Sequence, residues 1–182
     1  MTMSLRPPAE FSPPSPGSEE PLWRKMTAAD LPAVETIGST VHPDLPEDPA
    51  VFAERLNLYP DGCWVVQIDG AIAGYAVSHP WRLGPPPKLN SLLNRLPPAP
   101  DSFYIHDLAL VPLARGTGAG SRLVHRLVEQ ARREHLHRMS LVAVNGSSGF
   151  WQRHGFHAAD DAVITQSLGS YGDTACWMVR EI

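Results

Sequence analysis

Three residues that could act in proton transfer lie in one short segment, Tyr104-Ile-His-Asp-Leu-Ala109. In a strand, period-two alternation places Tyr104 and His106 on the same face, with Asp107 on the other face unless a bulge intervenes. An unperturbed imidazole titrates near neutral pH, so His106 suits removal of a proton from an amine, directly or through water. The alternative is a histidine that is hydrogen-bonded for structural reasons in a half-buried strand.

A glycine-rich turn follows at residues 115–121, between a predicted strand and the strongest predicted helix. Such a turn presents unpaired backbone N–H groups at the positive end of a helix dipole, and glycines allow a ligand to approach closely. It therefore predicts an anion cradle, with phosphate as the anion, unless the glycines only turn a corner. A P-loop would need Lys after Gly120, where Ser121 stands, and a dinucleotide fingerprint would need a different glycine spacing.

The elements that position these residues follow from hydrophobic periodicity and turn signals. Helices are predicted at 31–41, 49–58, 120–134 and 147–154. Strands are predicted at 22–26, 63–68, 71–79, 102–111, 139–144, 162–167 and 174–180. Asp69-Gly70 marks a two-residue hairpin turn. Residues 89–96 are predicted to form a further short helix.

Proline occurs 19 times, about double the usual share of roughly 5%. The prolines concentrate at residues 1–21 and 80–100. Residues 1–20 also have little to bury, which predicts a disordered tail. Residues 21–182 are predicted to form a single domain, because 182 residues in all are too few for two separately stable domains. The segment 80–100 is predicted to be an insertion loop of this domain.

The charge balance argues against several classes of partner. The 15 basic and 19 acidic residues give a formal net charge of -4, which does not favour binding to nucleic acid. No apolar run approaches the roughly 20 residues that cross a bilayer, and the N-terminus lacks the apolar segment of a signal peptide, so a cytoplasmic protein is expected. Cys63 and Cys176 form no disulfide framework and are interpreted as reduced thiols.

The glycine-rich turn resembles the acetyl-CoA motif of the GNAT N-acetyltransferase superfamily, R/Q-x-x-G-x-G/A. Every specified position is matched by Arg115-Gly-Thr-Gly-Ala-Gly120. The preceding Leu108-Ala-Leu-Val-Pro112 is similar to the family's L-A-V-x-P segment. The ranges 24–32 and 145–156 resemble the family's first strand and helix and its second conserved stretch. The resemblance covers about residues 22–182.

The resemblance implies an α+β (mixed α/β) GNAT fold, with a mostly antiparallel twisted sheet of about 6–7 strands flanked by about four helices. Strands 102–111 and 139–144 would run parallel and splay apart, with the pantetheine arm of acetyl-CoA in the gap. An amide near Leu110 would polarise the thioester carbonyl. The residues implied to bind acetyl-CoA are Leu108, Ala109, Leu110, Arg115, Gly116, Thr117, Gly118, Ala119, Gly120, Ser121, Asn145 and Trp151.

The implied reaction is direct attack of an amine on acetyl-CoA, without a metal. The pattern around His106 is similar to the arylalkylamine N-acetyltransferases, which carry histidines at both equivalent positions, whereas the first position here is Tyr104. Many family members use a tyrosine as acid where this chain has Trp151. Tyr171 and Tyr104 are the candidate substitutes. Trp151 is then expected to pack against the pantetheine or the core, and Asn145 to bond the pantetheine backbone.

The acceptor is expected to be a small-molecule or protein amine. A cationic amine could be held by acidic residues of the first two helices and their connection, beside an aromatic residue and the insertion loop. The acidic residues are Asp44, Glu47, Asp48 and Glu54, the aromatic residue is Trp81, and the insertion loop is residues 80–100. A solvated acidic surface is the alternative. Two other functions stay open, namely a non-catalytic acetyl-CoA-binding sensor of the same fold and an unrelated nucleotide-binding domain. A homodimer is also left open.

Overall fold

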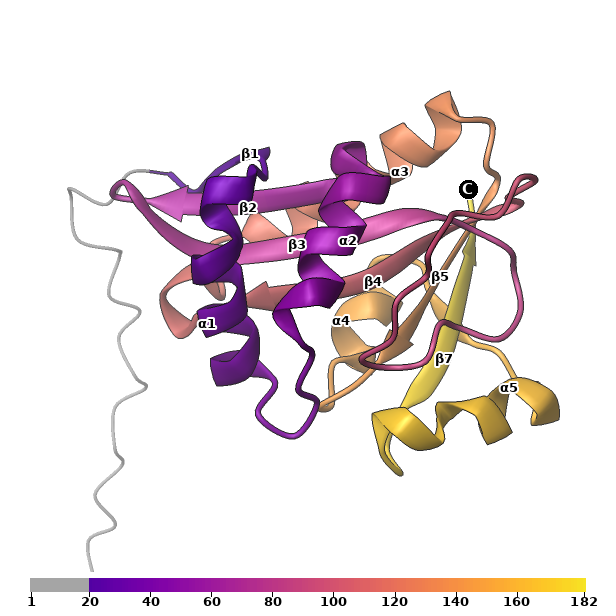
Figure 1. Cartoon of the computed structure of the whole chain (residues 1–182). Coiled ribbons are helices and arrows are strands. Elements are labelled where there is room, and N and C mark those ends of the chain that lie inside the picture. The colour runs from indigo at the N-terminus through magenta and orange to yellow at the C-terminus, as the bar shows by residue number, and fades with distance from the viewer. Residues whose placement is uncertain (1–19) are drawn as a thin grey trace, which may run out of the picture.

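Seven strands form one mixed sheet in the computed structural model, which describes residues 20–182 (Figure 1). The sheet order is β1-β2-β3-β4-β5-β7-β6, and only β4 and β5 pair in parallel. The strands are β1 Leu22–Lys25, β2 Cys63–Ile68, β3 Ala71–Trp81, β4 Ser102–Leu110, β5 Arg138–Ala143, β6 His157–Ala158 and β7 Cys176–Glu181. The predicted α+β fold is confirmed. Apart from Glu20, the predicted tail at residues 1–20 lies outside the described residues.

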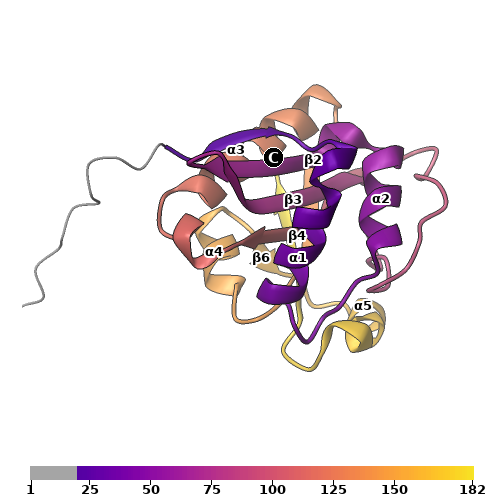
Figure 2. The same ribbon diagram turned by 60° about the vertical axis from the view of Figure 1, so that its left-hand side comes forward.

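Helices cover both faces of the sheet (Figures 1 and 2). On one face, α1 (Leu31–Val41) and α2 (Pro49–Leu58) pack against β2, β3 and β4. On the other face lie α3 (Ala119–Arg133) and α4 (Ser148–Arg153), and α5 (Ala162–Ser167) packs beside β7. None of the described helices is long and apolar enough to cross a membrane.

Local sequence signals explain most element boundaries. Asp69 and Gly70 have φ of 51° and 77°, as a two-residue hairpin turn between β2 and β3 requires. Pro49 begins α2, where its missing N–H leaves no bond unmade. The predicted apolar stripe of α3 is buried, including Leu123 and Leu127 with no exposed surface. These predicted elements are confirmed.

The predicted strand at residues 162–167 is wrong, because this segment is the helix α5. The Asp161 side chain caps the helix by accepting from the amides of Val163 at 2.9 Å and Ile164 at 3.1 Å. Ile164 is the only buried residue of the segment, so one helical face suffices to bury it. β-Branched residues such as Val163, Ile164 and Thr165 favour strands in general, but here the cap and the single buried position favour a helix.

The predicted helix at residues 89–96 is also wrong, because the segment has no regular secondary structure. Asn90 and Asn94 adopt left-handed conformations, with φ of 52° and 62°. Two such residues interrupt a helix, and asparagine tolerates them better than most residues do. The segment instead runs as an irregular chain between α2 and α5 (Figure 2).

Asp30 organises the start of α1. Its carboxylate accepts from Arg24 Nη1 and Nη2 at 2.8 Å each, and from the Thr27 amide at 2.8 Å. The Arg24 hydrogen bonds hold the pKa of Asp30 far below its ordinary value, although burial opposes this shift. The ionised Asp30 therefore joins β1 to the first helix.

We expect Asp30→Asn to lower the free energy of unfolding by about 1–3 kcal/mol at pH 7, because charge-assisted hydrogen bonds are lost. Since the native pKa lies below the unfolded one, the contribution is complete above the ordinary carboxyl pKa and declines as pH falls toward the native value. Urea unfolding of both proteins at pH 7 and pH 3 should show a shrinking difference. Asp61→Asn, at an exposed pair with Lys25, is the control and should change little.

Candidate active site

The parallel strands β4 and β5 separate part of the way along their length. They pair at only three positions, Phe103 with Met139, Tyr104 with Ser140 and Ile105 with Leu141. Both strands continue beyond this point, but they no longer pair with each other. They separate because β4 has a bulge at His106, a residue that has no partner in the register between β3 and β4. A gap therefore opens between the two strands beyond Ile105, as predicted.

Two backbone amides of β4 face this gap. Val111 N donates to Ala73 O at 3.0 Å, so these residues form a hydrogen-bonded antiparallel pair. Such pairs alternate along a strand, so the polar backbone groups of Leu108 and Leu110 point away from β3 and toward β5. Past the last β4–β5 pair, the amides of Leu108 and Leu110 form a free strand edge, while the Leu110 carbonyl accepts from Arg115.

The glycine-rich turn lies where β4 leads into α3. Gly116 and Gly118 have φ of 75° and 80°, which favours glycine at both positions. Within the described residues, the amides of Gly116, Thr117 and Gly118 make no hydrogen bond. A Cβ placed on Gly116 would meet nothing within 4 Å, so the turn is open to a ligand. Together with the α3 dipole, it can cradle a phosphate.

Other residues of the turn support this cradle. Arg115 Nε donates to Leu110 O at 2.9 Å, which fixes the guanidinium at the end of β4. Gly120 has a different role, because a Cβ there would come within 3.1 Å of the Phe150 ring. Gly120 thus lets α4 pack closely against the start of α3.

A cavity of about 600 Å³ extends from Arg115, at the start of the glycine-rich turn, to the middle of β4, whereas Gly116 to Ser121 do not line it. Arg115, Asn145 and Phe150 line one part of it, and His106, Glu47 and Tyr171 line another. Of the residues predicted to bind acetyl-CoA, those that line the cavity are Leu108, Leu110, Arg115, Asn145 and Trp151. The cavity therefore joins the free edge of β4 to the predicted base.

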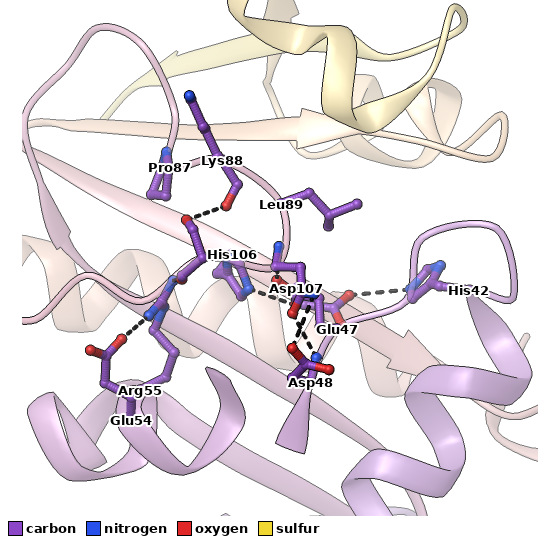
Figure 3. Close-up of polar contacts among 12 residues, drawn as sticks. His42, Glu47, Asp48, Glu54, Arg55, Pro87, Lys88, Leu89, His106 and Asp107 are labelled. Atoms are coloured by element: carbon purple, nitrogen blue, oxygen red, sulfur yellow. Dashed lines mark hydrogen bonds and ion pairs between the residues drawn. The ribbon is translucent and has the colours of Figure 1, made fainter. Parts of the chain in front are cut away.

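His106 and Glu47 form a buried pair (Figure 3). His106 Nε2 lies 2.9 Å from Glu47 Oε2, and the side chains are 1% and 5% exposed. Burial alone would raise the pKa of Glu47, but the neighbouring His106 brings it below the ordinary value. The other nitrogen, His106 Nδ1, is buried and has no partner among the described residues.

A second pair lies beside the first, because the bulge brings Asp107 to the same face as His106. His42 Nε2 lies 3.2 Å from Asp107 Oδ1, and the Tyr75 hydroxyl donates to Asp107 Oδ2. Burial would lower the pKa of His42, but Asp107 raises it above the ordinary value. Burial would likewise raise the pKa of Asp107, and His42 lowers it. Two carboxylates thus stand at the wall of the cavity.

The two candidate tyrosines occupy different places. Tyr171, at the end of a 3₁₀ turn (Leu168–Tyr171), lines the cavity and donates to Pro87 O at 2.6 Å. Burial raises the pKa of Tyr171 to about 12. Tyr104 is fully buried against Trp177, with ring centroids 6.3 Å apart, and is absent from the cavity lining. Only Tyr171 therefore faces the cavity.

Asn145, in the loop after β5, and Trp151, in α4, both line the cavity. Asn145 Nδ2 lies 3.0 Å from His42 Nδ1, which links the loop after β5 to the end of α1. Trp151 is 6% exposed and packs edge-on against Phe150 and Phe156. The indole thus belongs mainly to the core while one side faces the cavity.

The acids predicted to attract an amine divide into two groups. Asp44 and Glu47 line the cavity. Asp48 instead accepts from the Asn90 side chain, and Glu54 accepts from the amides of Leu93 and Asn94. Asp48 and Glu54 therefore hold the proline-rich segment rather than facing an acceptor.

Sequence reasoning missed Glu47 as the partner of His106, and it missed the His42–Asp107 pair. His106 and Glu47 are 59 residues apart, so no local spacing could indicate their contact. The only usable signal was the acid cluster around Glu47. Across residues 20–182, no group of three or more His, Cys, Asp or Glu side chains could hold a metal ion.

Comparison with known proteins decides the family. The sequence model of the Acetyltransferase (GNAT) family matches residues 25–156. The chain belongs to this family. No curated protein sequence matches the GNAT chain significantly.

Solved structures share the GNAT fold at low sequence identity. The GNAT-like decarboxylase GphF, in complex with isobutyryl-CoA, has a TM-score of 0.74 and 18% identity, covering 88% of this chain and 98% of that one. The loading GNATL domain of CurA from Lyngbya majuscula has a TM-score of 0.71 and 13% identity, covering 90% and 98%. Ard1 from Thermoplasma volcanium has a TM-score of 0.67 and 15% identity, covering 90% and 99%.

Proposed function

We propose that this protein is an N-acetyltransferase that transfers the acetyl group of acetyl-CoA directly to an amine. The observation that carries the proposal is the cavity that runs from Arg115, beside the glycine-rich turn, along Leu110 and Leu108 of β4 to His106. GphF, which has a similar fold, was solved in complex with isobutyryl-CoA, and this supports an acyl-CoA ligand for the present protein. GphF is a decarboxylase, so similarity of fold does not identify the reaction. We assign the reaction from the side chains of this site.

The residues fit acetyl-CoA along this path. The free amides of Gly116 to Gly118 would receive the pyrophosphate, and Arg115 would add positive charge. The Leu110 amide would pair with the pantetheine arm. We assign polarisation of the thioester carbonyl to the Leu108 amide, which is nearer along β4 to His106 than the initially predicted Leu110.

His106 would act as the general base. We assign the imidazole proton to Nε2 of His106, which then donates a hydrogen bond to Glu47. In this tautomer Nδ1 carries the free lone pair, and Nδ1 is the nitrogen that has no partner among the described residues. The amine nitrogen forms a bond to the thioester carbonyl carbon, and its proton passes to Nδ1 directly or through water. The bond from carbon to sulfur then breaks. Glu47 stabilises the imidazolium that forms, so it is a positioning residue.

Tyr171 would supply a proton to the departing thiolate. Because burial raises its pKa to about 12, its hydroxyl stays protonated at neutral pH. It would have to exchange its bond to Pro87 O for one to sulfur. We prefer Tyr171 to Tyr104, because Tyr104 lies outside the cavity lining.

The test is release of CoA thiol from acetyl-CoA across a panel of primary amines, with mass spectrometry of the acetylated product. We expect release that depends on the amine. Binding of acetyl-CoA by calorimetry without release for any amine would support the non-catalytic sensor instead. The absence of a tyrosine at the Trp151 position keeps that second candidate open.

The cradle makes its own prediction. Gly116→Ala places a Cβ in the open space of the turn and strains a φ of 75°. We expect the Kd for acetyl-CoA, measured by calorimetry, to rise about tenfold, which corresponds to about 1.4 kcal/mol.

The matched control is Gly70→Ala in the β2–β3 turn, where φ is 77° and the space around the Cβ is equally open. Gly70→Ala should cause similar backbone strain without a change in Kd. Equal Kd values for the two variants would contradict the assignment of the cradle.

A further inference from the structure

Residues 82–101, here called the strap, connect β3 to β4 and cross the rim of the cavity beside His106. Their two ends meet, because Leu83 N donates to Asp101 Oδ1 at 2.7 Å. Between these ends the strap contacts two walls that are remote from each other in the sequence, the α1–α2 region and the turn before β7.

Carboxylates hold the strap to the first wall (Figure 3). Asn90 N donates to Glu47 Oε1 at 3.1 Å, while Asp48 N donates to Asn90 Oδ1 at 2.7 Å. Further along, Glu54 accepts from Leu93 N at 2.7 Å. Glu47 therefore binds the strap with one oxygen and His106 with the other.

Hydrogen bonds and apolar packing hold the strap to the second wall. The Tyr171 hydroxyl donates to Pro87 O at 2.6 Å, and Leu89 N donates to Ser170 Oγ at 3.4 Å. Leu89 also packs with Tyr171 in one apolar cluster, and both residues line the cavity. Residues 87–90 thus bridge both walls directly over the end where an acceptor must lie.

Such a bridge would obstruct an extended polypeptide that entered between the two walls. The pantetheine arm must also share the cavity of about 600 Å³ with the acceptor. We propose that the acceptor is a small, cationic primary amine with an apolar body, and that the strap excludes protein and peptide amines. This inference rests on the proposed acetyltransferase function.

The lining of the acceptor end matches this chemistry. Asp44, Glu47 and Asp107 supply carboxylates, and Leu45 and Leu89 supply apolar surface. His42 and His106 each face one of these carboxylates. The only arginine or lysine in the lining is Arg115, at the glycine-rich turn. A positive amine on an apolar body is complementary to this end of the cavity.

The experiment compares pairs of acceptors that carry the same amine. For each of several amino acids, the kcat/KM of the amino acid amide is measured beside that of a pentapeptide beginning with that residue, together with simple alkyl and aryl amines. We expect the best small amine to exceed every peptide by about 100-fold. Peptides acetylated as well as the small amines would overturn this inference and leave the acetyltransferase function intact. No acceptor at all would refute both.

Variants test whether the strap causes the exclusion. The double variant Asn90→Gly/Ser170→Ala removes one side-chain tether at each wall, and glycine tolerates the left-handed φ at position 90. We expect the preference for small amines over peptides to fall about fivefold or more, with Kd for acetyl-CoA unchanged. Lys88→Ala, an exposed side chain of the strap, is the matched control and should keep the preference. An unchanged preference in the double variant would overturn the role of the strap.

A stronger variant replaces residues 84–99 with two glycines, which the contact between Leu83 and Asp101 permits. Peptide acetylation should then become measurable. Should this variant not fold, the double variant still decides the question, because both of its substitutions lie at exposed positions.

Discussion

Replacing His106 with alanine should lower kcat by about 100- to 10,000-fold, the range expected for loss of a general base. The contacts of His106 are with Glu47, His79 and Tyr104 rather than with the glycine-rich turn, so the Kd for acetyl-CoA should stay within about twofold. The measurements are steady-state thiol release with the best amine and calorimetric binding of acetyl-CoA. A large loss of turnover with an unchanged Kd identifies a catalytic histidine. A change in the unfolding transition is expected in either case, because the buried Glu47 loses its partner.

Glu47→Gln tests the positioning role of the carboxylate. It keeps an oxygen acceptor 2.9 Å from His106 Nε2 but removes the charge that would stabilise the imidazolium. We expect a loss of kcat of about tenfold, smaller than that of His106→Ala. Added imidazole should restore part of the activity of His106→Ala but none of that of Glu47→Gln. The control is His157→Ala, which replaces an exposed histidine and should keep full activity. Full activity of His106→Ala would show that His106 is not part of the mechanism.

The parts of the site that local sequence determines could be predicted. The glycine-rich turn, the apolar stripe of α3 and the Asp69-Gly70 hairpin each depend on residues a few positions apart. The separation of β4 from β5 was also expected, but through family resemblance rather than from any local pattern. Short-range physics and a specific motif therefore located the side of the cavity that we propose for acetyl-CoA.

The acceptor side could not be predicted in the same way, because long-range contacts build it. The bulge at His106 turns Asp107 toward α1, and alternation alone places Asp107 on the opposite face. The acids near Glu47 looked like one cluster for an amine, whereas Asp48 and Glu54 bind the strap. Which carboxylate meets which amide depends on the path of residues 82–101, and no periodicity describes that path.

Arg55 is a buried connection between α2 and the strap. Its side chain is 1% exposed, although it is a charged residue on a short helix. Its guanidinium donates to Glu54 Oε2 through Nη1 and to Ser91 O at 2.9 Å through Nη2. Burial lowers the pKa of Arg55, and the carboxylate of Glu54 opposes that shift. The buried guanidinium of Arg55 therefore depends on the neighbouring carboxylate for charge compensation.

We expect Arg55→Leu to lower the free energy of unfolding by about 3–5 kcal/mol, because it leaves Glu54 without its cation in a poorly hydrated place. Urea unfolding followed by circular dichroism measures this change. Arg95→Ala, an exposed arginine of the same strap, should change stability by less than about 0.5 kcal/mol. If Arg55→Leu lowered the free energy of unfolding as little as Arg95→Ala, the interpretation of Arg55 and Glu54 as a buried ion pair would be contradicted.

The double variant Glu54→Leu/Arg55→Leu separates the ion pair from the anchoring of the strap. An apolar replacement of an isolated buried ion pair is often neutral or stabilising. Glu54, however, also accepts from the amides of Leu93 and Asn94, which would lose their partner. Stability should therefore recover only in part, and exchange of these two amides with solvent deuterium should become faster. Full recovery with unchanged exchange would mean that Glu54 serves only to neutralise Arg55.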